Sequence, residues 1–177
     1  MTQFHKQRDS IGLSQTNFFT EKTVDGRGSE AWFRTLNECN KLGVKFCFFD
    51  NSNSNRDLGM YEKLIDCYQA DTNAVLLTLS GNVHNRIVPF NDAKTMGCYL
   101  KERFGNKVCS INHTNNGGTM FSRTSKGLKV HTIEPTDGIF STSTMYDNYY
   151  LPNIFNITEY SGFLYTKTMT ASLPRTK

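Results

Sequence analysis

The chain has 177 residues, the size of one domain or of part of a larger one, and too few for two independent cores. Hydrophobic residues make up 37% of it, and 13 Phe, 8 Tyr and 1 Trp supply bulky side chains that a disordered chain lacks. The formal net charge is +4 without a clustered basic stripe, so the composition gives no reason to expect nucleic acid as a partner.

Targeting signals and cysteines set further expectations. No apolar run approaches the ~20 residues that span a bilayer, and the N-terminus lacks an apolar stretch of the signal-peptide type. We therefore expect no membrane partner and a cytoplasmic location by default, with secretion by a signal-peptide-independent route as the alternative. Five cysteines stand singly without a CxxC motif, and their odd number favours reduced thiols. Cys47, Cys98 and Cys109 lie in apolar stretches, which predicts small core residues.

The first predicted elements follow a polar N-terminal stretch. Residues 1–27 lack a clear pattern and are predicted to be an arm or remnant before a single α/β domain over residues 28–177. Ser29 can cap a helix with an apolar face, and Gly43 is typical of the left-handed residue that ends one. Residues 44–49 (VKFCFF) then form an apolar run that is typical of a strand covered on both faces.

Two more helix and strand pairs continue this order. Asp57 can cap a second helix, in which apolar residues recur every three or four positions. Residues 74–79 (AVLLTL) predict a second buried strand, residues 92–104 a third helix that stops at Gly105, and residues 108–111 a third strand. Helices that alternate with short strands in this way predict an α/β fold, a parallel sheet with helices on both faces in three layers.

The pattern is weaker beyond residue 112. Residues 115–118 (NNGG) predict a turn or flexible loop, and residues 128–133 (LKVHTI) alternate like an edge strand. Residues 139–165 are rich in Tyr, Phe, Ser and Thr but show no firm period, so no element is predicted there.

Polar side chains follow the ends of the first two predicted strands. Asp50 closes the first strand, Asn82 and His84 follow the second, and Arg56 and Asp57 begin the next helix. Because parallel sheets bind ligands at the carboxyl ends of their strands, we expect these groups to share one rim. A histidine can move protons near neutral pH, a carboxylate can orient it, and an arginine can hold an anionic or carbonyl oxygen. Together these groups predict a hydrolytic site.

Each of these residues also has a structural interpretation. His84 can be a loop histidine, Asp50 a turn residue and Asp57 a helix cap beside a solvated Arg56. The other three histidines stand alone and are predicted to have surface or structural roles (His5, His113 and His131). No zinc-peptidase, serine-hydrolase or nucleotide-binding motif is present. One histidine with scattered carboxylates does not supply the three ligands of a catalytic zinc, so we predict no metal and no cofactor.

Short motifs occur in a fixed order along the middle of the chain. An Arg-Asp-x-x-Met sequence is followed by an apolar stretch that ends in Gly-Asn-x-His, then by Met-Gly-x-x-Leu and by Asn-Gly-Gly. These motifs begin at Arg56, Gly81, Met96 and Asn116. The arrangement resembles the erythromycin esterase family and its ChaN-like and Tiki-like relatives. With the preceding helix and strand, the resemblance covers residues 28–118.

The resemblance implies a parallel-sheet α/β fold whose esterase members use histidines and a carboxylate to activate water for attack on an ester or lactone. His84 matches the histidine of the family's second half, with Asn82 beside it. Haem would enter only by analogy with the ChaN-like relatives. The chain departs from the family because no Gly-Glu-x-His motif precedes residue 50. Three interpretations follow: a truncated version of the fold in a fragment of a longer protein, a shortened relative that binds without catalysing, or an active site that is completed differently.

Two functions follow from this comparison. The missing motif favours a degenerate or partial hydrolase-like module that acts as a binding or effector protein, with a small-molecule ligand or a host protein as its partner. The alternative is an active hydrolase in which His84 is the general base, Asp50 or Asp57 orients it, and Arg56 stabilises the oxyanion. The sequence does not define the oligomeric state.

Overall fold

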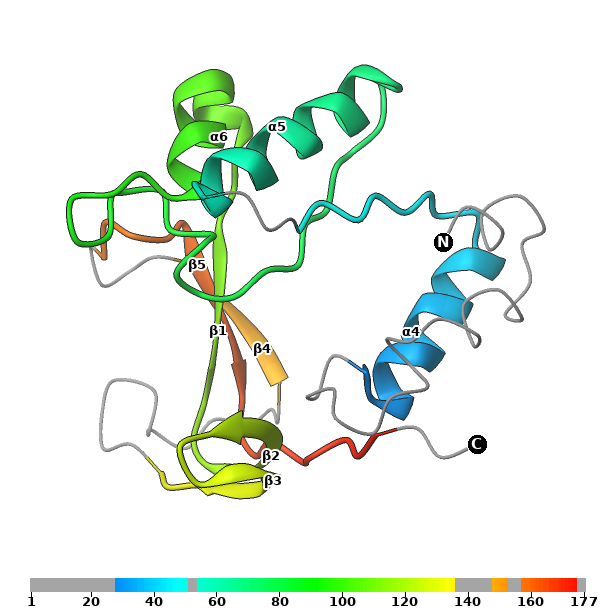
Figure 1. The fold of residues 1–177 in the computed structure, drawn as a ribbon, viewed down its shortest axis with the longest axis vertical. Coiled ribbons are helices and arrows are strands. Elements are labelled where there is room, and N and C mark those ends of the chain that lie inside the picture. The colour runs from blue at the N-terminus through cyan, green and yellow to red at the C-terminus, as the bar shows by residue number, and fades with distance from the viewer. Residues whose placement is uncertain (1–27, 51–53, 136–147, 153–156, 175–177) are drawn as a thin grey trace. The chain divides into compact units, whose positions relative to one another are not determined.

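The computed structural model describes residues 28–50, 54–135, 148–152 and 157–174. The predicted arm over residues 1–27 lies outside them. The chain divides into two compact units. Figure 1 labels the helices and strands of both. The first comprises Met1–Phe46, Asn115–Ser143 and Lys167–Lys177, and the second comprises Cys47–Thr114 and Thr144–Thr166. A single domain over residues 28–177 stays a prediction.

Helix α4 (Glu30–Lys41) belongs to the first unit and confirms the first predicted helix. Ser29 caps it, because its side chain accepts a hydrogen bond from the Trp32 amide (3.3 Å). Gly43 follows the helix with a φ of 79°, the left-handed conformation expected of the residue that ends it. Phe33 and Leu36 are buried on one face of α4.

A β-hairpin also belongs to the first unit. Strand β2 (Gly118–Thr124) pairs antiparallel with β3 (Gly127–Ile133), and Gly118 lies opposite Ile133. Strand β3 confirms the strand predicted at residues 128–133. Strand β2 was not predicted, because its sequence (GTMFSRT) has no continuous apolar run or clear alternation.

Two packed helices form the core of the second unit. Met60 and Leu64 of α5 (Arg56–Gln69) pack with Met96 of α6 (Met96–Phe104), and all three are almost fully buried. A short 3-10 helix, η2 (Gly105–Lys107), follows α6.

The caps of these two helices differ from those predicted. Asn55 caps α5 through the Leu58 amide (3.1 Å), so Asp57 lies in the first turn instead of at the cap. Helix α6 begins four residues later than predicted, because Asn91 and Asp92 adopt positive φ values that a right-handed helix does not allow. Its cap is Thr95, and Gly105 ends it as predicted.

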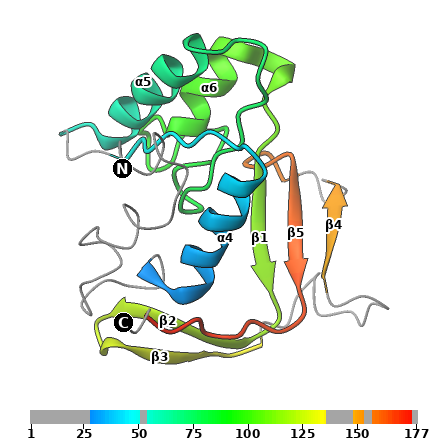
Figure 2. The ribbon, with the colours of Figure 1, turned by 90° about the vertical axis from the view of Figure 1, so that its right-hand side faces the viewer.

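A three-stranded sheet has the order β1-β5-β4. It consists of β1 (Ile111–Asn115), β5 (Gly162–Thr166) and β4 (Asn148–Pro152). Strands β1 and β5 run in the same direction, and β4 runs antiparallel to β5 (Figure 2). The mixture of helices and strands with a small parallel pairing is consistent with the predicted α/β class. Strands β4 and β5 lie in the region where no element was predicted.

Two of the three predicted strands are wrong. Neither residues 44–49 nor residues 74–79 form a strand, and of the third predicted strand (residues 108–111) only Ile111 lies in a strand, at the start of β1. The side chains of Val75, Leu77 and Leu79 are 96%, 85% and 64% exposed. A short apolar run indicates burial only when another element covers it, and the described residues do not cover this one.

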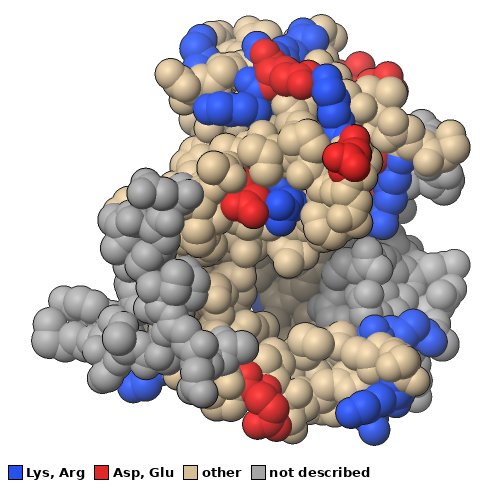
Figure 3. Space-filling view, turned by 90° about the vertical axis from the view of Figure 1, so that its left-hand side faces the viewer, with Lys and Arg blue, Asp and Glu red and all other residues tan. Residues whose placement is uncertain are grey.

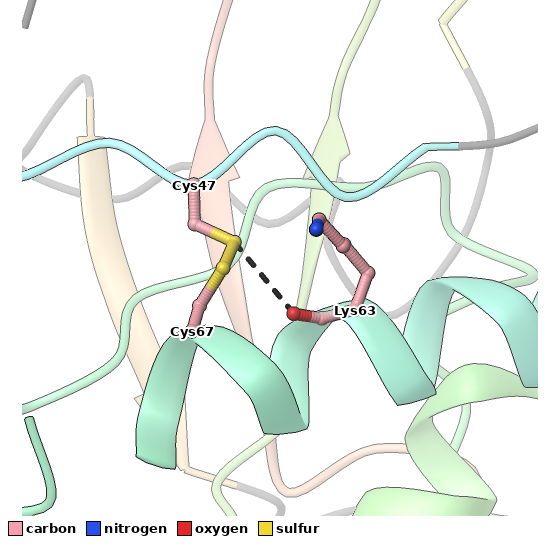
Figure 4. The surroundings of a disulfide bond; sticks show 3 residues. All are labelled: Cys47, Lys63 and Cys67. Carbon is pink, nitrogen blue, oxygen red and sulfur yellow. Dashed lines mark hydrogen bonds between the residues drawn. A yellow bond between two sulfur atoms is a disulfide. The ribbon is translucent and has the colours of Figure 1, made fainter. Parts of the chain in front are cut away.

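A disulfide joins Cys47 to Cys67 of α5, with Cα atoms 6.2 Å apart (Figure 4). The prediction of reduced thiols is therefore wrong for Cys47 and Cys67, whereas the other three cysteines are free. Cys47 is also only partly buried, so its predicted core role is wrong. The odd number of cysteines does not show which of them meet, whereas the fold brings two residues 20 positions apart into bonding distance. Cys98 is buried as predicted, but Cys109 is exposed.

The disulfide predicts a specific alkylation pattern. Denatured chain treated with iodoacetamide without reductant should gain three carbamidomethyl groups, because Cys39, Cys98 and Cys109 are free. After reduction the same chain should gain five, and intact-mass spectrometry measures both numbers. Five groups without reduction would contradict the bond. A Cys47→Ser variant serves as the control, because it frees the Cys67 thiol and should gain four under both conditions.

Candidate functional site

His84 and Asp57 form a hydrogen-bonded pair in the second unit. The His84 Nδ1 atom lies 3.0 Å from Asp57 Oδ1, and the two side chains are 22% and 21% exposed. When Nδ1 carries the proton and donates it to the carboxylate, Nε2 keeps a free lone pair and can accept a proton. The pair therefore combines an oriented imidazole with partial access to solvent.

The Asp57 carboxylate also binds the start of α6. The Met96 amide donates to Asp57 Oδ1 at 2.7 Å. An amide in the first turn of a helix has no acceptor within that helix, and the N-terminus of a helix favours negative charge nearby. One carboxylate oxygen thus joins the first turns of α5 and α6 and holds the imidazole in the same place.

Gly97 allows α6 to approach the turn that carries His84. Its amide donates to the His84 carbonyl at 2.8 Å. A Cβ atom at Gly97 would lie 2.3 Å from the Arg86 carbonyl oxygen and 2.6 Å from that of Asn85, which is closer than van der Waals contact permits. Only glycine fits this contact, and the Met-Gly sequence marks it.

Asp50 and Arg56 form a second pair. The Arg56 Nε atom donates to Asp50 Oδ1 at 2.8 Å, and Nη2 donates to Oδ2 at 2.6 Å. The hydrogen bond with Asp50 raises the pKa of Arg56 above its usual value. Both side chains are about half exposed, so the pair adds little stability. Of the two acids considered as partners of His84, Asp57 bonds to the imidazole and Asp50 bonds to Arg56.

Asn82 contributes its backbone, and its partner was missed by sequence analysis. The Tyr160 hydroxyl donates to the Asn82 carbonyl at 2.8 Å. Tyr160 lies in the region without a firm period, so no sequence signal linked it to the turn.

The other histidines bond to other partners or lie outside the described residues. His113 bonds to Thr166 and His131 to backbone carbonyls, while His5 lies outside the described residues. Burial lowers the pKa of His113.

An open depression of about 300 Å³ lies beside α5. It is lined by Phe48, Phe49, Asp50, Gly59, Glu62, Lys63 and Asp66. A neighbouring depression of about 270 Å³ is lined by Ser54, Asn55, Leu58, Gly59 and Glu62. His84 lines neither of the two, so of the predicted site residues only Asp50 borders this space.

Metal binding and membrane insertion are two other classes of function on which the described residues bear. In the described ranges, no cluster of three or more His, Cys, Asp or Glu side chains could hold a metal ion. No helix there is both long enough and apolar enough to cross a membrane. Basic and acidic side chains are interspersed on the face drawn in Figure 3. The predicted absence of a metal and of a cofactor stays a prediction.

Comparisons with known proteins give a weak likeness. No family model matches the sequence, and no curated protein matches it. Among solved structures, the chain is similar to a mutant of the erythromycin esterase EreC in its open conformation. The TM-score is 0.35 and the sequence identity 14%, over 81% of this chain and 42% of the other. The chain thus spans less than half the length of that protein, and a likeness at this level establishes no activity.

Proposed function

We propose that the chain is hydrolase-like and that His84, oriented by Asp57, acts as the general base in the hydrolysis of an ester or lactone. The 3.0 Å contact between His84 Nδ1 and Asp57 Oδ1 carries this proposal. The substrate class comes from the family resemblance of the motifs around these two residues. A three-layer arrangement of sheet and helices belongs to the same proposal.

The proposed step is a proton transfer coupled to attack by water. The water oxygen attacks the carbonyl carbon while one water proton passes to His84 Nε2, and the imidazolium then donates this proton to the leaving oxygen. Asp57 holds the ring and stabilises the imidazolium charge. Arg56 could stabilise the oxyanion only after exchanging its two hydrogen bonds with Asp50 for bonds to the substrate.

A binding module without catalysis is the second candidate. Two observations favour it: Asp50 occupies two donors of Arg56, and His84 borders neither depression beside α5. In this version the motifs maintain a ligand-binding fold, and the Asp57 carboxylate serves to fix α5, α6 and the turn. An effector role with a host protein as partner is a special case of this candidate.

Substitution of Asp57 by asparagine tests the first proposal. The asparagine oxygen can still accept the Met96 amide, so the fold should persist, but the charge that orients and stabilises the imidazole is lost. We expect kcat for a hydrolysed ester or lactone to fall by about 100-fold, a typical contribution of positioned acid–base groups. Steady-state kinetics on a panel of esters and lactones measures this effect.

Glu102→Gln is the matched control, because Glu102 is an exposed acid on α6 of the same unit and lines neither depression. The Glu102→Gln variant should leave kcat unchanged. Equal rates for Asp57→Asn and Glu102→Gln would contradict a role for the pair. A panel without any hydrolysis by the unsubstituted chain would contradict the enzyme and support the binding module.

A further inference from the structure

The turn that carries His84 has no regular secondary structure, yet all its carbonyl groups are hydrogen-bonded. Each backbone carbonyl from residue 81 to residue 86 accepts a hydrogen bond. The donors, in chain order of the acceptors, are the His84 amide, the Tyr160 hydroxyl, the Arg86 amide, the Gly97 amide, the Ser110 hydroxyl and the Thr95 hydroxyl. A loop satisfied in this way is held in one conformation by its surroundings.

The segment 159–162 supplies the contact that is most distant in sequence. The Tyr160 hydroxyl reaches the Asn82 carbonyl from 78 residues away. The Ile87 amide donates to the Glu159 carbonyl (2.9 Å), and Arg86 Nη2 donates to the Glu159 carboxylate (3.2 Å). Tyr160 and Glu159 thus form hydrogen bonds with the turn both before and after His84.

We propose that Tyr160 is a positioning residue for His84: its hydroxyl, bonded to the Asn82 carbonyl, fixes the turn so that the imidazole Nδ1 faces Asp57. The assignment of a catalytic task to His84 rests on the proposed function, whereas the positioning itself does not.

The surroundings of Tyr160 suit this role. The side chain is 7% exposed, and its ring packs edge-on against Phe163. Burial raises the pKa of the phenol, so the hydroxyl remains a donor through the neutral range. Removing this hydroxyl would leave the Asn82 carbonyl without its donor two residues before His84, which releases the turn on one side.

The experiment is Tyr160→Phe, which keeps the ring and removes only the hydroxyl. In the unsubstituted chain, NMR should detect the His84 Nδ1–H proton bonded to Asp57. We expect the exchange of this proton with solvent to become about tenfold faster in Tyr160→Phe. A factor of about ten corresponds to the net stabilisation that one hydrogen bond provides. Where hydrolysis is measurable, kcat should fall by a similar factor with KM unchanged.

Tyr61→Phe is the matched control, since the Tyr61 hydroxyl accepts a hydrogen bond from the exposed Arg103 side chain (3.4 Å) instead of donating to the turn. Equal exchange rates in Tyr160→Phe and Tyr61→Phe would overturn the proposal. If Tyr160→Phe does not fold, the hydroxyl proton of Tyr160 is measured by NMR in the unsubstituted chain instead. Exchange of that proton too fast for detection, while the His84 Nδ1–H proton is protected, overturns the proposal. A chain without hydrolysis leaves the NMR result valid, so the failure of the proposed function is distinguishable from the failure of this inference.

Discussion

Replacement of His84 by alanine is expected to lower the rate of ester or lactone hydrolysis by about 100- to 10,000-fold, the usual contribution of a positioned general base. The variant should keep its melting temperature nearly unchanged. The His84 imidazole is partly exposed. The backbone carbonyl of residue 84 still accepts the hydrogen bond from the Gly97 amide after the substitution. The Met96 amide still donates to Asp57, so this partly buried carboxylate keeps a hydrogen-bond partner. Initial rates and a thermal melt check both parts.

The control for this variant is His131→Ala. His131 belongs to the β2–β3 hairpin, where its Nε2 contacts the carbonyls of Ser122 and Gly127. The His131→Ala variant should retain full hydrolytic activity. Undiminished turnover in His84→Ala would remove the basis for the proposed enzyme. A large loss of melting temperature in the same variant would instead assign His84 a structural task.

Replacement of Gly97 by alanine is expected to lower the free energy of unfolding by about 3 kcal/mol, the upper end of the usual cost of overpacking. The new methyl group would meet two backbone carbonyl oxygens at 2.3 and 2.6 Å. Neither can withdraw easily, because Thr95 bonds to the Arg86 carbonyl and Ser110 to the Asn85 carbonyl. Urea unfolding followed by circular dichroism measures the change.

Gly81→Ala is the matched substitution in the same turn. A Cβ atom at Gly81 would lie 3.6 Å from His84 Cδ2, an ordinary contact, and its φ needs no left-handed conformation. This variant should change stability by less than about 0.5 kcal/mol, as for most substitutions that break no specific feature. Similar stabilities for the two alanine variants would mean that α6 does not approach the turn this closely.

Local signals predicted the helices better than the strands. Ser29, Gly43 and Gly105 act on their own neighbours in the chain, so their cap and stop roles could be predicted from sequence. Whether residues 74–79 form a strand depends on a partner elsewhere, which composition does not reveal. The β4 and β5 strands were missed for the converse reason, since pairing creates them without a strong pattern of their own.

The candidate site divides in the same way. The His84 turn and the Arg56-Asp57 pair were found because short motifs mark them, and the structure brings His84 and Asp57 together. The bond between Asp50 and Arg56 was not predicted, because a strand end and a helix start give no information on which acid meets which base. Tyr160 could not be found, since its contact with Asn82 joins segments 78 residues apart.

The bond between Cys47 and Cys67 closes a covalent ring of chain. Three of the five candidate residues lie within that ring: Asp50, Arg56 and Asp57. Reduction of this disulfide by a thiol reductant during purification opens the ring. The reduced and the oxidised preparations are then chemically different samples. Assays of this protein should therefore state the redox history of each sample.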